Sequence, residues 1–117
     1  MEKQNMIKEK SFDFAIEIIK LYKNLTEQKK EYVMARQLLK SGTSIGANVR
    51  EAEFAQSKAD FVSKMSIALK EANETAYWLD LLFESNYIDK ELFQHYKIKS
   101  TEILKLLISI VKSSKNN

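Results

Sequence analysis

The sequence predicts an all-α protein, an up-down-up-down antiparallel four-helix bundle, with residues 1–117 forming a single domain. The chain has no Pro and only two Gly, whereas β-rich folds need many turns built from these residues. Apolar residues recur at spacings of three and four in four long segments, as amphipathic helices require. Only short polar stretches separate these segments, and short connections place consecutive helices antiparallel.

The first helix is expected over Ile7–Glu27, with Ser11 as a cap if it starts later. It has two apolar stripes where a core-facing helix needs only one. The first stripe comprises Phe12, Ala15, Ile16, Ile19 and Tyr22, and the second comprises Phe14, Ile18, Leu21 and Leu25. We expect the surplus apolar surface to be buried between subunits, because soluble monomers avoid exposing large apolar patches.

The second helix is expected over Tyr32–Ala55, and it contains the small-residue segment Ser41–Gly46. Two glycines cost a helix about 1 kcal/mol each. We nevertheless predict a continuous helix, because the apolar phase set by Leu38 is recovered at Ile45 and Val49. The small residues would then let a neighbouring helix approach closely.

The third helix is expected over Lys58–Glu84, because Ser57 followed by Asp60 three residues later is a capping signal. Its apolar seam comprises Phe61, Met65, Ala68, Ala72, Ala76, Leu79 and Phe83. Trp78 falls beside this seam. It is either the edge of the core or an anchor for a second subunit.

The fourth helix is expected over Lys90–Lys112, capped by Asp89 and followed by a frayed tail at Lys115–Asn117. Its seam comprises Leu92, Tyr96, Ile103, Leu107 and Ile110, widened by Phe93, Leu104, Leu106 and Val111. The surplus apolar surface and the unplaced Trp lead to one predicted oligomer interface. Its residues are Phe14, Ile18, Leu21, Trp78, Leu104, Ile108 and Val111.

The sequence contains little that could support catalysis. His95 is the only His, with Glu91 four residues before it, and there is no Cys. A di-metal bundle needs Glu-x-x-His on two helices. The segment Gly42–Gly46 lacks the Lys-Ser/Thr ending of a phosphate loop. Glu71 and Glu74 could support acid–base chemistry, but surface ion pairs explain them more simply. We therefore expect no enzyme activity, no cofactor and no metal site.

The chain shows no feature of membrane insertion or export. Its N-terminus lacks the apolar core of a signal peptide, and no apolar run approaches the ~18 residues of a membrane span. With no Cys as well, we expect a cytoplasmic protein without a membrane partner.

The last helix carries a line of lysines opposite its apolar seam. At about 100° per residue, these lysines fall within an arc of about 80°. They are Lys90, Lys97, Lys105, Lys112 and Lys115. Such a stripe predicts salt-sensitive binding to the phosphate backbone of RNA or DNA. A solvated lysine face that binds nothing is the alternative.

The middle of the chain has a recognisable pattern: Ser44-Ile45, then Asn48, Glu51, Ser57 and Phe61. Over about residues 38–82 the chain resembles the four-helix-bundle proteins encoded by intervening sequences of bacterial 23S ribosomal RNA genes. The accessory variability proteins of diversity-generating retroelements are similar to that family. One departure is Glu53, where related sequences often have Gly.

This resemblance implies a ring of five subunits without enzyme activity. For the retroelement relatives it also implies binding to a reverse transcriptase and to nucleic acid. The sequence thus predicts a non-enzymatic oligomeric assembly or adaptor protein with backbone-directed nucleic-acid binding. The alternative is a purely protein-binding scaffold, for example of a reverse transcriptase, with no nucleic-acid contact.

Overall fold

Four helices account for nearly all of residues 2–116, which are the residues that the structure, a computed structural model, describes. The helices are α1 (Glu2–Glu27), α2 (Val33–Glu53), α3 (Lys58–Glu84) and α4 (Lys90–Asn116). Each packs against the next along the chain, and α1 and α4 close the bundle through the least extensive contact. The four-helix bundle predicted from the sequence is confirmed.

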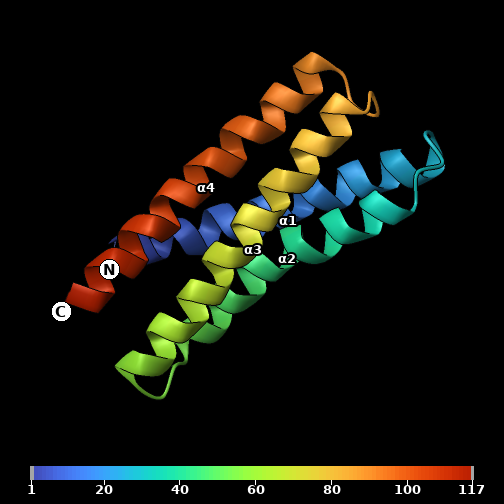
Figure 1. Cartoon of the computed structure of the whole chain (residues 1–117). Helices are drawn as coiled ribbons and strands as arrows, with labels where there is room; N and C mark the ends of the chain where they lie inside the picture. Colours follow the sequence, from blue (N-terminus) through green and yellow to red (C-terminus); the bar gives the residue numbers. More distant parts are fainter. Residues whose placement is uncertain (1, 117) are drawn as a thin grey trace.

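The bundle is elongated, with extents of 45 × 21 × 19 Å. Both chain ends lie at the same end as the α2–α3 turn, and the α1–α2 and α3–α4 turns lie together at the other end (Figure 1). This places two helical hairpins side by side, with both of their tips at one end of the molecule.

The predicted helix boundaries hold in the middle of the chain and fail near its ends. Ser57 caps α3 by accepting the Asp60 N–H at 3.1 Å, and Asp89 caps α4 by accepting the Leu92 N–H at 2.8 Å. Ser11 does not start α1, which begins at Glu2; its side chain is buried instead. Our prediction of a frayed tail was wrong for the described residues, because α4 continues to Asn116, while Asn117 lies outside them.

The small-residue segment is helical, and its glycines set the distance between α1 and α2. A Cβ added at Gly42 would lie 2.9 Å from Ile18 side-chain atoms, closer than side chains approach one another. A Cβ at Gly46 would lie 3.4 Å from the Ser11 carbonyl oxygen. The lower helix propensity of these glycines is thus offset by close packing of α1 onto α2.

The core runs the length of the bundle and contains few polar groups. On α1 the buried residues are Ile7, Ser11, Phe14, Ile18, Leu21 and Leu25. The hydroxyls of Ser41 on α2 and Thr75 on α3 hydrogen-bond to each other at 2.9 Å. Within residues 2–116, no buried side-chain N or O atom lacks a partner. The core is therefore complete within one chain, and the surface residues are left for function.

Candidate interaction surfaces

The two apolar stripes of α1 have the opposite roles to those we predicted. Phe14, Ile18 and Leu21 are at most 2% exposed and fill the core. They leave no surface for a second subunit, so their assignment to an oligomer interface is corrected. Phe12 and Ile16, from the other stripe, are exposed, with Phe12 at 53%.

The exposed stripe of α1 borders an open groove between α1 and α2, which we call the α1/α2 face. The groove measures about 470 Å³. Its lining residues are Lys8, Ser11, Phe12, Ala15, Ile19, Thr43, Gly46, Ala47, Arg50 and Glu51. Thr43, Gly46 and Ala47 of α2 line the groove, and α1 and α2 approach each other closely at Gly46. The mainly apolar lining suits a macromolecular contact better than a small polar ligand.

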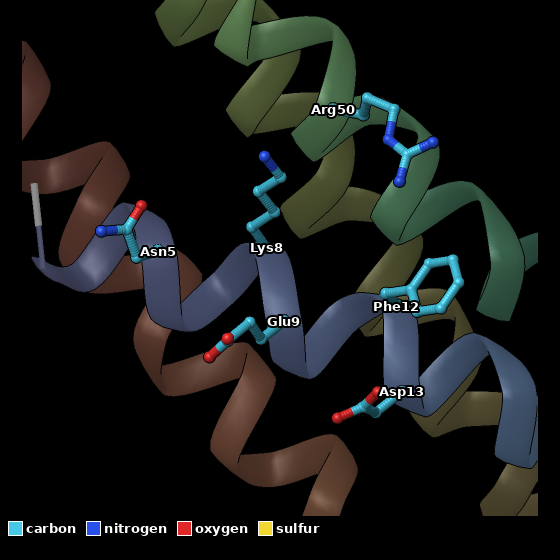
Figure 2. A pocket seen from close by; sticks show the side chains of 6 residues that line it. All are labelled: Asn5, Lys8, Glu9, Phe12, Asp13 and Arg50. Atoms are coloured by element: carbon cyan, nitrogen blue, oxygen red, sulfur yellow. The ribbon is translucent and has the colours of Figure 1, made fainter.

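A second hollow, of about 680 Å³, continues this face toward the N-terminus (Figure 2). The guanidinium of Arg50, from α2, lies 5.9 Å from the centre of the Phe12 ring on α1. Lys8 pairs with Glu53 at 3.0 Å, which gives a role to the residue that departs from the related pattern. Glu9 and Asp13 line the same hollow, so its charges are mixed and select no single ligand class.

The remaining predicted interface residues differ widely in exposure. Val111 is buried, which corrects its assignment to the interface as well. Trp78 and Leu104 are half-buried against the core, and the Trp78 indole N–H donates to the Glu74 carboxylate at 3.3 Å. Ile108 is 51% exposed. Among these four residues, only Ile108 is largely free to contact another molecule.

The lysine stripe of α4 is on the surface, as the sequence predicted, but it is less uniform than expected. Lys97 pairs with Asp80 of α3 at 2.9 Å. Within residues 2–116, the other four stripe lysines have no acidic partner within 4.0 Å. They are Lys90, Lys105, Lys112 and Lys115, and all four are exposed. Ile98 and Ile108 are also exposed along this side of the helix.

His95 belongs to a polar contact between α1 and α4. Its Nε2 lies 3.0 Å from a Glu17 carboxylate oxygen, and the neighbouring Tyr96 hydroxyl donates to the Glu17 carbonyl at 2.7 Å. The hydrogen bond from His95 holds the pKa of Glu17 below its ordinary value. Burial, reinforced by the negative charge of Glu17, raises the pKa of Tyr96 to about 12. The only His therefore links two helices.

Neither a metal-ligand cluster nor a membrane-spanning helix is found in residues 2–116. In the part of the chain that is described, no three His, Cys, Asp or Glu side chains gather as a metal site would require. Over the same residues, no helix is long and apolar enough to cross a membrane. The α1/α2 face and the exposed cations are the surface features that bear on interaction with other molecules.

Sequence reasoning missed a concentration of charge at the α1–α2 hairpin. Residues 20–40 carry six basic and two acidic side chains, a net charge of +4, while the whole chain carries +3. We call this segment the basic tip. Its basic residues are Lys20, Lys23, Lys29, Lys30, Arg36 and Lys40. Counting charge helix by helix splits this cluster at the turn, whereas counting across each hairpin would have found it.

The neighbouring α3–α4 hairpin has the opposite charge. Residues 77–97, a segment of equal length that we call the acidic tip, carry four acidic and two basic side chains. The net charge is −2, with His95 neutral. Since both tips lie at one end of the bundle (Figure 1), that end has a positive and a negative half.

Comparisons with known proteins place the chain in a family. The chain matches the family model of the 23S rRNA-intervening sequence protein over residues 3–109. It is also similar to a crystal structure of a protein with unknown function from the S23 ribosomal protein family of Bacteroides thetaiotaomicron. The two are 59% identical with a TM-score of 0.92, over 94% of this chain and 98% of the other. The comparison with curated proteins returned no match. The chain therefore belongs to the family of 23S rRNA-intervening sequence proteins.

Proposed function

We propose that this protein works as a homo-oligomeric assembly or adaptor protein without catalytic activity. The observation that carries the proposal is the α1/α2 face, where Phe12 and Ile19 stay exposed, with Ile16 exposed beside them on α1, although the core is already complete. Apolar surface of this kind on a helix pair marks a site of association. The ring of five implied by the family resemblance is the expected assembly.

The chain itself carries a surface that complements the α1/α2 face. Arg50 on α2, which lines this face, has no acidic partner among residues 2–116. On α3, Ile67 and Tyr77 are exposed beside the carboxylates of Glu71 and Glu74, which would pair with Arg50 of a neighbouring subunit. A contact between two different faces is heterologous, and heterologous contacts close into rings when the rotation permits.

Light scattering of the wild type and of an Ile16→Lys, Ile19→Lys variant tests the assembly. We expect the wild type to be an oligomer at micromolar concentration and the variant a monomer with unchanged helical content. Ile98→Lys is the matched control, because Ile98 is exposed but lies on α4. A monomeric wild type would overturn the proposal. An oligomer that survives the double substitution would show that another face mediates assembly.

A second function, binding to the nucleic-acid backbone, is supported by the four unpaired lysines of the α4 stripe. In an oligomer the stripe would repeat, and each phosphate contact releases counterions, so binding would be sequence-tolerant and would weaken steeply with salt. A variant with Lys105→Glu, Lys112→Glu and Lys115→Glu should lose RNA and DNA binding at low salt while keeping its oligomeric state. Equal binding by this variant would exclude the α4 stripe as the binding surface.

The resemblance to accessory variability proteins adds a protein partner, a reverse transcriptase, to this proposal. The α1/α2 face and the exposed cations would then both take part in the adaptor function. Co-purification of the chain with a reverse transcriptase encoded beside its gene would support this partner. A purely protein-binding scaffold would bind the polymerase but would retain no RNA even at low salt.

A further inference from the structure

The basic tip combines a high density of cations with very few internal partners. Glu31 accepts the Ala35 N–H at 2.8 Å and is thereby used to cap α2. Lys20 lies 3.6 Å from Glu17. Within residues 2–116, the other five cations have no acidic group within 4.0 Å. They are Lys23, Lys29, Lys30, Arg36 and Lys40, and all are exposed. This positive charge is directed to solvent.

An aromatic side chain stands among these cations. Tyr32 lies in the chain between the lysines of the turn and Arg36, and its side chain is 50% exposed. Exposed aromatic rings among cations characterise surfaces that bind single-stranded nucleic acid, because bases stack on the ring while phosphates meet the cations. The α4 stripe has no aromatic residue at the exposed positions between its lysines, so it lacks this second element.

The size of the tip suits a short stretch of strand. From Val33 to Lys40, α2 spans about 10 Å at 1.5 Å per residue. That length limits the contact to a few nucleotides of one strand. A lipid surface fits less well, because only Tyr32 and Val33 are exposed apolar residues at this tip. Interfacial membrane binding draws on a longer apolar face.

The backbone of the turn holds one cation in a strained conformation. Lys30 has φ of 56°, in the left-handed region that disfavours side chains other than Gly and Asn. The Glu31 N–H donates to the Leu25 carbonyl at 2.9 Å and ties the turn to the end of α1. The turn thus presents Lys29 and Lys30 on a backbone anchored to the bundle.

We propose that the basic tip binds single-stranded RNA or DNA, with its lysines and Arg36 on consecutive phosphates and Tyr32 stacked on a base. This inference rests on the nucleic-acid function proposed above and deepens it, because it adds a surface and names the form of nucleic acid. The tip prefers single strands over duplexes, since stacking on Tyr32 requires an unpaired base. The acidic tip beside it repels the strand and confines it to the α1–α2 hairpin.

Fluorescence anisotropy with a 15-nucleotide oligo(U), an oligo(dT) of equal length and a duplex of that length tests the proposal. A tip variant carries Lys29→Glu and Arg36→Glu, with Lys30 kept because of its left-handed backbone. Removing two phosphate contacts should make single-strand binding less sensitive to salt. The magnitude of the slope of log affinity against log salt should fall by about 1.4. Tyr32→Ala should weaken single-strand binding about tenfold and leave duplex binding unchanged.

Two control variants match these substitutions. Lys58→Glu with Lys70→Glu changes the formal charge by the same amount on exposed positions of α3, and Phe54→Ala removes an exposed aromatic ring outside the basic tip. Both controls should bind oligo(U) as the wild type does. Circular dichroism and light scattering should show unchanged helicity and oligomeric state in all variants.

The outcomes separate this inference from the proposed function. If the wild type binds no nucleic acid at low salt, both the nucleic-acid function and the role of the tip are wrong. If the α4 stripe variant loses binding while the tip variant and Tyr32→Ala bind as the wild type does, the nucleic-acid function stands and the tip inference is overturned. Equal losses in the tip variant and in the α3 charge control would also overturn it, because only net charge would then matter.

Discussion

The two helical hairpins end side by side, yet their tips are built in opposite ways. The acidic tip is closed on itself: Phe83 and Phe93 stack at 4.3 Å between ring centres, and Ile88 in the turn is buried. Lys97 pairs with Asp80 across the same two helices. In the basic tip, by contrast, Tyr32 and Val33 are exposed next to the turn, and most of the cations have no acidic partner within residues 2–116.

This difference separates a structural tip from an interacting one. Both hairpins connect antiparallel helices through short turns, so the connection by itself does not require either arrangement. The acidic tip uses its aromatic and charged side chains to hold α3 against α4. The charged side chains of the basic tip are mostly unpaired among residues 2–116, which makes them available for a partner.

The largest expected effect tests whether the acidic tip is the structural one. Phe83→Ala should lower the free energy of unfolding by about 2–3 kcal/mol, less than for a fully buried Phe because Phe83 is half-buried. Tyr32→Ala in the basic tip should change it by less than about 0.5 kcal/mol. Urea unfolding followed by circular dichroism measures both. Equal losses in the two variants would remove the distinction between the tips.

The next effect concerns Asp89, which caps α4 after the α3–α4 turn, and Glu31, which caps α2 after the α1–α2 turn. Asp89→Ala should destabilise the protein by about 1 kcal/mol, because its carboxylate accepts the Leu92 N–H in an N-capping contact. Glu31→Ala should cost about half as much, since Glu31 reaches Ala35 from before the capping position. Thermal unfolding of the two variants compares them. A larger loss for Glu31→Ala would show that the basic tip depends more on its cap.

A smaller effect, of opposite sign, comes from the left-handed residue in each turn. Lys30 has φ of 56° and Asn86 has φ of 67°. Lys30→Gly should stabilise the protein by about 0.5–1 kcal/mol, because Gly removes steric strain that Lys incurs there. Asn86→Gly should gain only a few tenths of a kcal/mol, since Asn tolerates this conformation. If the two glycine variants have the same urea midpoint as the wild type, the turns carry no such strain.

The smallest effect is the pH dependence of the contact between His95, in the acidic tip, and Glu17. The folded-state pKa of Glu17 lies below its ordinary value of 4.5. Glu17 therefore contributes stability above pH 4.5, and this contribution is lost as the pH falls through the lowered pKa. The stability difference between wild type and Glu17→Gln should shrink between neutral pH and about pH 3. If the stability difference between the two proteins stays constant over this pH range, the Glu17→Gln substitution acts through side-chain packing and not through the loss of the carboxylate charge.

Local sequence determined the helices and most of their ends. Apolar spacing within each segment predicted α3 residue for residue, and the capping residues Ser57 and Asp89 act as expected because a cap needs only its own first turn. The continuity of α2 through Gly42 and Gly46 was also predictable, because the apolar phase before and after them agrees.

Only the tertiary structure decided which side of α1 faces inward and which charges come together. Periodicity shows that Phe12 and Phe14 lie on different stripes, but burial depends on the neighbouring helices. The close approach of Gly42 to Ile18 turns the stripe with Phe14 inward and leaves Phe12 outside. The basic tip is a continuous segment of the sequence, but its place beside the acidic tip depends on how the two hairpins pack (Figure 1). Sequence thus sets the faces of each helix, and packing selects which of them remain for function.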